Sequence, residues 1–280
     1  MLLGKGLSPA GFAVVADHCR AGCRVQTVSL GETIDITFDF RSDTPGWPKT
    51  DPDARSPTLR RYHRLLWSKP LPSGSPFELD AATAGIYLHP RCELVHPRSD
   101  LGRFGLSSDA VIPTFSRAPD KKLKHIFGQI PEAETEEFNR IAYTIGGMMV
   151  FPGYQVDRKM TINGARGCHP RIRDRFDLTL ECIRRHYLDE PGLFPLRDTL
   201  ARYADFFGLF GDFAGYVDFF HLQDLVDEAT LTIKFFMPFD DFTGSPLPGT
   251  LDAYLAYRQG ATEFIESRNR RIATHVGAEC

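Results

Sequence analysis

The sequence predicts an α+β fold, a single domain with a mostly antiparallel sheet and a C-terminal layer of helices. Strand-like patterns occur early and in the middle of the chain, in residues 25–41 and 143–163, and a Pro-Gly turn interrupts the second. Helical patterns dominate the last third, in residues 196–227 and 250–275. Strands with a segregated helical layer are typical of the α+β class.

The 280 residues are enough to bury a substantial core, and no repeat, low-complexity tract or long linker divides them. Residues 1–30 read as a short helix and a loop, and we expect them to be an N-terminal appendage. Residues 31–280 are then the single α+β domain.

Composition indicates an ordinary globular protein, with 42% apolar and 25% charged residues. No apolar run approaches the roughly 20 residues of a membrane helix, and no secretory leader pattern is evident. These observations predict a cytoplasmic protein that does not enter a membrane. The formal net charge of −3 argues against a protein that coats nucleic acid with its whole surface.

The six cysteines are scattered along the chain, so a disulfide framework is not expected. His18, Cys19 and Cys23 form the one close group of metal-type ligands, and no second pair completes a four-ligand zinc site. No metal site is therefore predicted at this group. The cofactor stays unknown, and the P-loop and the dinucleotide fingerprint are both absent.

Residues 25–41 carry the clearest strand pattern. From Ile34 to Arg41 apolar and polar side chains alternate, so one face of a strand should be buried. The polar face would present Asp39, with Asp43 just beyond it. Carboxylates spaced in this way can act as acid and base, or hold Mg²⁺, so both are candidate catalytic residues. The alternative is the water-facing side of an antiparallel sheet.

The other elements follow from caps and breakers. Ser56 or Thr58 can cap a helix that begins near Pro57, and acids in the first turn support a helix over 131–142. Glycines are expected to break the aromatic-rich helix of 196–227. Strands are expected at 77–79, 86–88, 104–112, 143–151, 159–163 and 230–239, and the remaining helices at 171–187 and, from the N-cap Thr250, at 250–275.

Positive charge gathers between residues 158 and 185, where eight Arg or Lys face three acids. Within this stretch Gly164 and Gly167 bracket Arg166, which predicts a sharp corner with exposed amides and a guanidinium that can grip phosphate. Asn163 precedes the corner and would orient the ligand. The alternative is a plain corner with an exposed arginine.

The helix of 171–187 should bring further groups to this corner. Arg175 and Arg185 are candidate anion ligands, and His186 is the candidate proton carrier because an unperturbed imidazole titrates near neutral pH. The alternative is a solvated helix face with a ladder of ion pairs, each contributing a few tenths of a kcal/mol.

Two other patterns carry less weight. Ser107-Ser108-Asp109 follows a predicted strand, but the sequence shows no base or oxyanion donor for a serine nucleophile. Arg268 and His275 resemble the spaced Arg–His pair of a class of helical ribonucleases, a spacing that arises readily by coincidence in a chain with this much Arg and nine His.

Longer motifs carry a resemblance to a known family. YTIGGMMVFPG, MTINGARG and RFDLTLECIRRHY, together with FDFRSD, FFMPFDDF and FIESRNRRI, resemble a widespread bacterial family of uncharacterised proteins. The resemblance covers about residues 33–272. It implies one conserved unit and supports an N-terminal appendage, but it carries no activity and no site residue.

The basic stretch predicts an intracellular protein that binds or processes a phosphate-bearing ligand, either a nucleotide or a nucleic acid. Asn163, Arg166, Arg175 and Arg185 would bind it, and His186, Asp39 and Asp43 would be catalytic if the protein is an enzyme. The alternative is a non-enzymatic interaction protein, such as a toxin–antitoxin or phage-defence component, whose basic patch docks an acidic partner.

Overall fold

Three short strands form one antiparallel sheet in the order β1-β2-β3. The computed structural model describes residues 33–79, 94–96, 104–112 and 123–278. Strand β1 spans Leu94–His96, β2 spans Phe104–Ala110 and β3 spans Met148–Pro152. In the β2–β3 ladder Asp109 lies opposite Met149.

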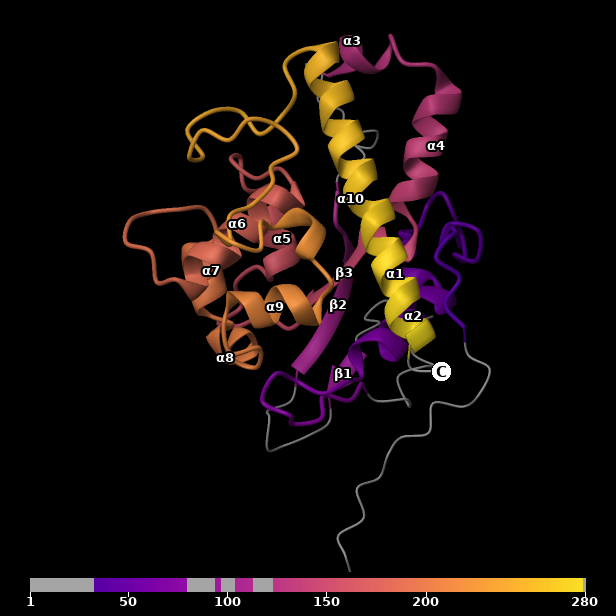
Figure 1. Cartoon of the computed structure of the whole chain (residues 1–280). Coiled ribbons are helices and arrows are strands. Elements are labelled where there is room, and N and C mark those ends of the chain that lie inside the picture. Colours follow the sequence, from indigo (N-terminus) through magenta and orange to yellow (C-terminus); the bar gives the residue numbers. More distant parts are fainter. Residues whose placement is uncertain (1–32, 80–93, 97–103, 113–122, 279–280) are drawn as a thin grey trace, which may run out of the picture. The chain divides into compact units, whose positions relative to one another are not determined.

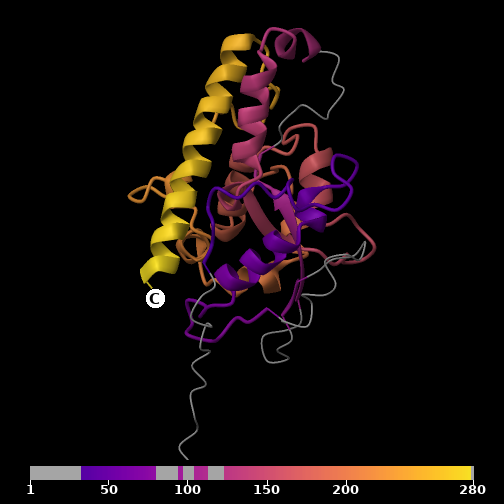
Figure 2. The same cartoon turned by 90° about the vertical axis from the view of Figure 1, so that its right-hand side faces the viewer.

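Helices make up most of the remaining structure. Their bounds are α1 Pro52–Arg55, α2 Pro57–Trp67, α3 Lys124–Phe127, α4 Glu132–Ala142, α5 Ile162–Cys168, α6 Phe176–Tyr187, α7 Arg197–Ala201, α8 Ala204–Gly208, α9 Phe213–Phe219 and α10 Leu251–Ala278, with 3₁₀ turns η2 Ile145–Gly147 and η3 Gln223–Leu225. The last helix, α10, runs beside α4, while α5 to α9 gather in a separate group (Figures 1 and 2).

The mixed helix–sheet class, the antiparallel pairing and the C-terminal helix are confirmed. The helices predicted at 57–67 and 131–142 are present, and Ser56 caps the first of them by accepting a hydrogen bond from the amide of Leu59 at 3.1 Å. The aromatic-rich segment is divided into α7, α8 and α9. The break at Gly208 and Gly211, between α8 and α9, is as predicted, but the break between α7 and α8 contains no glycine and Gly215 lies inside α9. The sheet is smaller than predicted, because several expected strands have another structure.

The strand predicted at 25–41 is wrong for its described part, which consists of turns. Asp35 accepts a hydrogen bond from the amide of Thr37, and Asp39 accepts one from the amide of Arg41. Asp side chains that bind the backbone two residues later stabilise turns. The apolar residues therefore alternate along a series of turns and not along a strand. Among their side chains, that of Phe40 is fully buried.

The second arm of the predicted hairpin, 159–163, is also wrong. Thr161 is an N-cap that accepts a hydrogen bond from the amide of Gly164 at 3.3 Å, and helix α5 begins at Ile162. The predicted Gly-Arg-Gly corner therefore lies inside a helix, so its amides are not presented to a ligand.

Two further strands are absent. Residues 77–79 and 230–239 are irregular. Within the described chain, an isolated bridge pairs Ile233 of the second segment with Val226. The side chain of Asp227 accepts hydrogen bonds from the amides of Ala229 and Thr230, which bends the chain. The predicted appendage 1–30, the strand at 86–88 and the His18–Cys19–Cys23 group lie outside the described residues.

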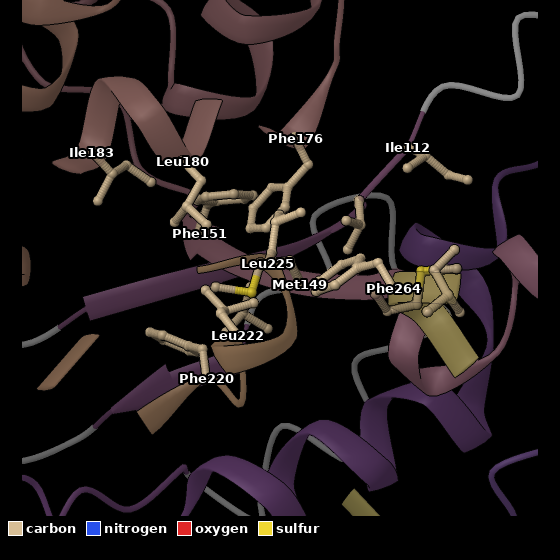
Figure 3. Packing of buried hydrophobic residues seen from close by; sticks show 14 of the residues in the cluster. Ile112, Met149, Phe151, Phe176, Leu180, Ile183, Phe220, Leu222, Leu225 and Phe264 are labelled. Atoms are coloured by element: carbon tan, nitrogen blue, oxygen red, sulfur yellow. The ribbon is translucent and has the colours of Figure 1, made fainter. Parts of the chain in front are cut away.

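The hydrophobic core lies between the sheet and the helices that pack on it. Phe151 of β3 packs against Phe176 of α6 with ring centroids 6.4 Å apart. Figure 3 shows these rings together with Leu180 of α6, and Leu222 and Leu225 from the segment after α9. Burial of this many large apolar side chains is the main favourable contribution to folding.

Arg268 fastens α10 to this core. Its guanidinium is completely buried and donates to three backbone carbonyls, those of Gly146, Met148 and Phe220, at 2.7–3.2 Å. Among the described residues no carboxylate forms an ion pair with it. Arg268 is therefore a structural clamp between α10, the start of β3 and the end of α9, and these contacts give no support to a ribonuclease-type role for it.

The next residue, Asn269, fixes the 3₁₀ turn η2 against α10. Its Oδ1 accepts from the amide of Gly146 at 2.7 Å, and its Nδ2 donates to Thr144 Oγ1 at 2.8 Å. A Cβ atom on Gly146 would come within 2.4 Å of the carbonyl oxygen of Ile265, so the close approach requires glycine.

Within the part of the chain that the structure describes, none of the helices is long and apolar enough to cross a membrane.

Candidate functional site

Polar side chains of β2 and α5 face one another at one edge of the core. On β2 the side chains of Leu106 and Ser108 are buried, while those of Ser107 and Asp109 lie on the opposite, half-exposed face. On α5 Asn163 and Arg166 are three residues apart and so share a helix face. Asn163 Nδ2 donates to Ser107 Oγ at 3.0 Å, and Arg166 pairs with Asp109.

Arg166 is the buried centre of this site. It is 0% exposed, and its Nη1 lies 2.6 Å from Asp109 Oδ2 and 3.1 Å from Asp174 Oδ1. Nη1 also donates to the carbonyl of Ala110, and Nη2 donates to that of Asp174. Its guanidinium also lies over the ring of Phe151 at 5.6 Å. The donors of this buried guanidinium already bind two carboxylates and several carbonyls. Arg166 therefore positions Asp109 and is not available to bind an anionic ligand.

Asp109 and Asp53 both hold protons more tightly than ordinary carboxyls. Burial raises the pKa of Asp53 to about 8, with the charges of Asp109 and Asp51 adding to the effect. Burial also raises the pKa of Asp109 to about 6, although Arg166 opposes this shift. At neutral pH the pair therefore comprises a protonated Asp53 and a largely ionised Asp109, which is the division of roles that acid–base sites use.

A second polar pair, His63 and Ser108, lies directly behind the strand. His63 Nε2 is 2.8 Å from Ser108 Oγ, and its Nδ1 accepts from the indole N–H of Trp67 at 2.9 Å. An indole nitrogen only donates, so Nδ1 is unprotonated and Nε2 must carry the proton of the neutral ring. Burial lowers the pKa of His63 well below its usual range, which keeps the ring neutral.

This tautomer decides the chemistry of the pair. Because His63 donates its Nε2 proton to Ser108, it does not accept the serine proton, and Ser108 is not activated as a nucleophile. The pair is a structural link between α2 and β2.

Asn163 Oδ1, by contrast, is buried and has no hydrogen-bond partner among the described residues, which leaves an acceptor next to Ser107 and Asp109.

The other predicted anion ligands lie in separate ion pairs. Arg175 is buried and forms a bidentate pair with the fully buried Asp177, and its Nη1 donates to the carbonyl of Pro246 at 3.2 Å. Asp177 also accepts from the amide of Phe236 at 3.0 Å. This cluster ties the start of α6 to residues 236–246. The hydroxyl of Thr179 links Arg166 to the backbone of Arg175, because it accepts from Arg166 Nε at 3.2 Å and donates to the carbonyl of Arg175 at 2.9 Å.

Arg185 and His186 lie toward the other end of α6. Arg185 binds Glu181 at 2.7 Å and Asp241 at 2.5 Å, and its guanidinium lies over the ring of Phe242. The His186 ring packs against Phe207, and burial lowers its pKa. The predicted convergence of Arg166, Arg175, Arg185 and His186 on one hollow is therefore not seen in the contacts of these residues.

Asp39 and Asp43 also have structural partners. Asp39 pairs with Arg41 at 2.6 Å, and Arg41 reaches on to Glu136 of α4 at 2.8 Å. Asp43 accepts from Ser56 Oγ at 2.6 Å and from the amide of Thr58 at 3.0 Å, so it supports the N-terminus of α2. Within the described parts of the chain, no group of three or more His, Cys, Asp or Glu side chains is placed to hold a metal ion.

A family model matches residues 34–272, which is most of the chain. The chain belongs to DUF6994, a family of unknown function. The resemblance drawn from the sequence motifs covers nearly the same range and is confirmed at this level, while the bacterial distribution of the family stays a prediction. No curated protein and no solved structure matches the chain.

Of the predicted site residues, this DUF6994 chain therefore brings together Asn163 and Arg166 alone. It adds Asp53, Ser107 and Asp109, which sequence reasoning did not place in the site. Asp109 had one available signal, its position at the end of a strand after two serines. Asp53 had none, because its neighbourhood with Asp109 is created by the packing of α1 on β2.

Proposed function

We propose that the DUF6994 chain carries an acid–base site in which Asp53 and Asp109 transfer a proton to and from a polar ligand held by Ser107 and Asn163. The observation that carries this proposal is the Asp109–Arg166 pair on the half-exposed face of β2, beside the partnerless oxygen of Asn163. Asp53, protonated at neutral pH, is the acid. Asp109, ionised and positioned by Arg166, is the base.

The charge balance around the pair favours an uncharged or cationic ligand. The charges of Asp109 and Asp51 act on Asp53, and the charge of Asp174 acts on Asp109. The cations that act on this pair are Arg60 and Arg166. Raised carboxyl pKa values are the expected result of such an acidic excess, and an added phosphate would be repelled.

The phosphate-ligand hypothesis is a prediction to which this site gives little support, since the guanidiniums of Arg166, Arg175 and Arg185 already bind carboxylates. The alternative of a non-enzymatic interaction protein also stays a prediction. A docking surface needs no carboxyl groups with raised pKa values. Titration of Asp53 and Asp109 therefore distinguishes an interaction protein from a protein with an acid–base site.

The ligand class can be tested by thermal shift. A panel of sugars, polyols, amides, amines and nucleotides is titrated against the wild type, Asn163→Ala and Ser107→Ala. We expect an uncharged or cationic compound to raise the melting temperature of the wild type. Loss of one ligand hydrogen bond should weaken its binding about three- to tenfold in each variant.

Gln259→Ala is the matched control, because it removes an exposed side-chain amide from α10 and should bind the compound as the wild type does. The proposal is contradicted if the compounds that stabilise the wild type all carry phosphate, or if Asn163→Ala and Ser107→Ala bind the stabilising compound unchanged.

A further inference from the structure

Two hollows adjoin one another along α10, away from the residues of the acid–base site. The first, the polar hollow, has a volume of about 490 Å³, and His221, Gln223, Arg270, Arg271 and His275 are among its lining residues. The second, the aromatic hollow, has about 340 Å³ and is lined by residues that include Leu225, Phe235, Phe236, Gly260 and Phe264. Both are also lined by Asp224 and Ser267, so they lie side by side, and we call the two together the groove.

The polar hollow presents cationic donors. Arg270 is exposed, and its guanidinium donates to the hydroxyl of Ser267 at 2.8 Å. Its charge is not neutralised by any described carboxylate. Arg271 is bound by both oxygens of Asp224 at 3.0 Å, yet it stays partly exposed at the same wall. A guanidinium without a carboxylate partner is a ready ligand for phosphate.

Two imidazoles extend this donor surface. The rings of His221 and His275 lie 4.7 Å apart, and Lys69 Nζ is 3.2 Å from His221 Nε2. An ammonium only donates, so His221 Nε2 accepts and Nδ1 carries the proton. Burial, together with the charges of Lys69, His275, Arg268 and Arg271, lowers the pKa of His221 to about 2. Several cations thus act on one ring beside the hollow.

The aromatic hollow is suited to a flat apolar group. Phe235 is half-buried and stacks on Phe239 with ring centroids 4.2 Å apart, while Phe236 and Phe264 are buried behind it. On the α10 side, Gly260 contributes bare backbone to the wall of the hollow, next to the side chains of Glu263 and Phe264. Aromatic rings and a bare backbone are the surfaces on which a heterocyclic base packs.

Hydrogen-bond acceptors lie where the two hollows meet. The carboxylate of Asp224 is at the junction, and Gln223 Oε1 is a buried acceptor without a partner among the residues described. Hydroxyl groups of a sugar would satisfy such acceptors, as acidic side chains do for ribose in dinucleotide sites.

We propose that this groove binds a mononucleotide, with the base in the aromatic hollow, the ribose at Asp224 and Gln223, and the phosphate at Arg270. The order of the three surfaces matches the order of the three parts of such a ligand. The proposal does not depend on the acid–base site, because the two sets of residues do not overlap.

Calorimetric titration of the full chain with adenosine monophosphate, adenosine and inorganic pyrophosphate tests it. We expect the mononucleotide to bind more tightly than either fragment probe. Arg270→Ala should weaken its binding about tenfold, the loss of one charge-assisted contact, and Phe235→Ala should weaken adenosine binding as well. Lys159→Ala, which removes an exposed positive charge elsewhere, should leave binding unchanged.

Three results would overturn the proposal. The first is no binding of the mononucleotide to the wild type. The second is equal affinity of the wild type and Arg270→Ala for it. The third is pyrophosphate binding as tight as that of the mononucleotide, since the aromatic hollow would then contribute nothing. Circular dichroism of each variant checks its fold, and Arg270→Lys, which keeps the charge, should bind more tightly than Arg270→Ala.

Discussion

Replacing Arg268 with alanine is expected to lower the free energy of unfolding by about 3–5 kcal/mol. The substitution removes the donors of three buried carbonyls, those of Gly146, Met148 and Phe220, and leaves a cavity beneath Trp67. Each buried carbonyl without a donor costs about 1–3 kcal/mol. The damage should be large because one side chain holds α10, β3 and the end of α9 together.

Urea denaturation followed by far-ultraviolet circular dichroism measures this effect. The control is Arg270→Ala, two residues further along α10 and exposed, which should change the unfolding free energy by no more than about 0.5 kcal/mol. Arg268→Lys should recover only part of the loss, because an ammonium cannot span three carbonyls in the way that a guanidinium does. Equal stability of Arg268→Ala and Arg270→Ala would show that the clamp contributes little.

Replacing Arg166 with methionine is the second large effect, with an expected loss of about 3–5 kcal/mol. The aliphatic part of the side chain is kept, but Asp109 and Asp174 lose their shared cation in a buried site. The loss should grow with pH. Without Arg166, the pKa of Asp109 rises further above its unfolded value, and a carboxyl with a raised folded pKa loses stability as pH rises between those two values.

The measurement compares Arg166→Met with the wild type in urea at pH 5 and pH 8. The stability deficit should be greater at pH 8, by at most about 1.4 kcal/mol per pH unit for one proton. The double variant Arg166→Met/Asp109→Asn removes the uncompensated carboxylate and should recover part of the loss at pH 8. A deficit that is the same at both pH values, with no recovery in the double variant, would contradict the assigned role of Arg166.

Helices and strands were predicted correctly where contacts between neighbouring residues determine them, and incorrectly where contacts with distant residues do. Helix α2 begins where Ser56 caps it, and α4 begins with an acidic first turn, so both follow from neighbouring residues. The residues around Asp39 alternate like a strand, but no neighbouring strand pairs with them within the described structure. Hydrogen bonds from Asp side chains to nearby amides then favour turns.

The site was harder to predict than the fold. Counting charges between 158 and 185 included the nearby acids but missed two distant carboxylates. Asp109 is 57 residues from Arg166, and Asp241 is 56 residues from Arg185. A local signal was also missed. Thr161 caps the N-terminus of helix α5, so the residues predicted to form a Gly-Arg-Gly corner are helical. Arg166, Arg175 and Arg185 of this positively charged stretch thus lie in separate ion pairs.

The partnership of Asp53 and Asp109 is likewise a product of tertiary packing. Neither residue stands out in the sequence. Burial is the main cause of both raised pKa values, with the charges of Asp109 and Asp51 adding to it at Asp53 and that of Asp174 at Asp109. A titration of side-chain carboxyl carbons by NMR, with Asp53→Asn and Asp109→Asn for assignment, measures these values directly. The acid–base account predicts midpoints of about 8 for Asp53 and about 6 for Asp109. Two midpoints near the ordinary aspartate value of about 4 would contradict it.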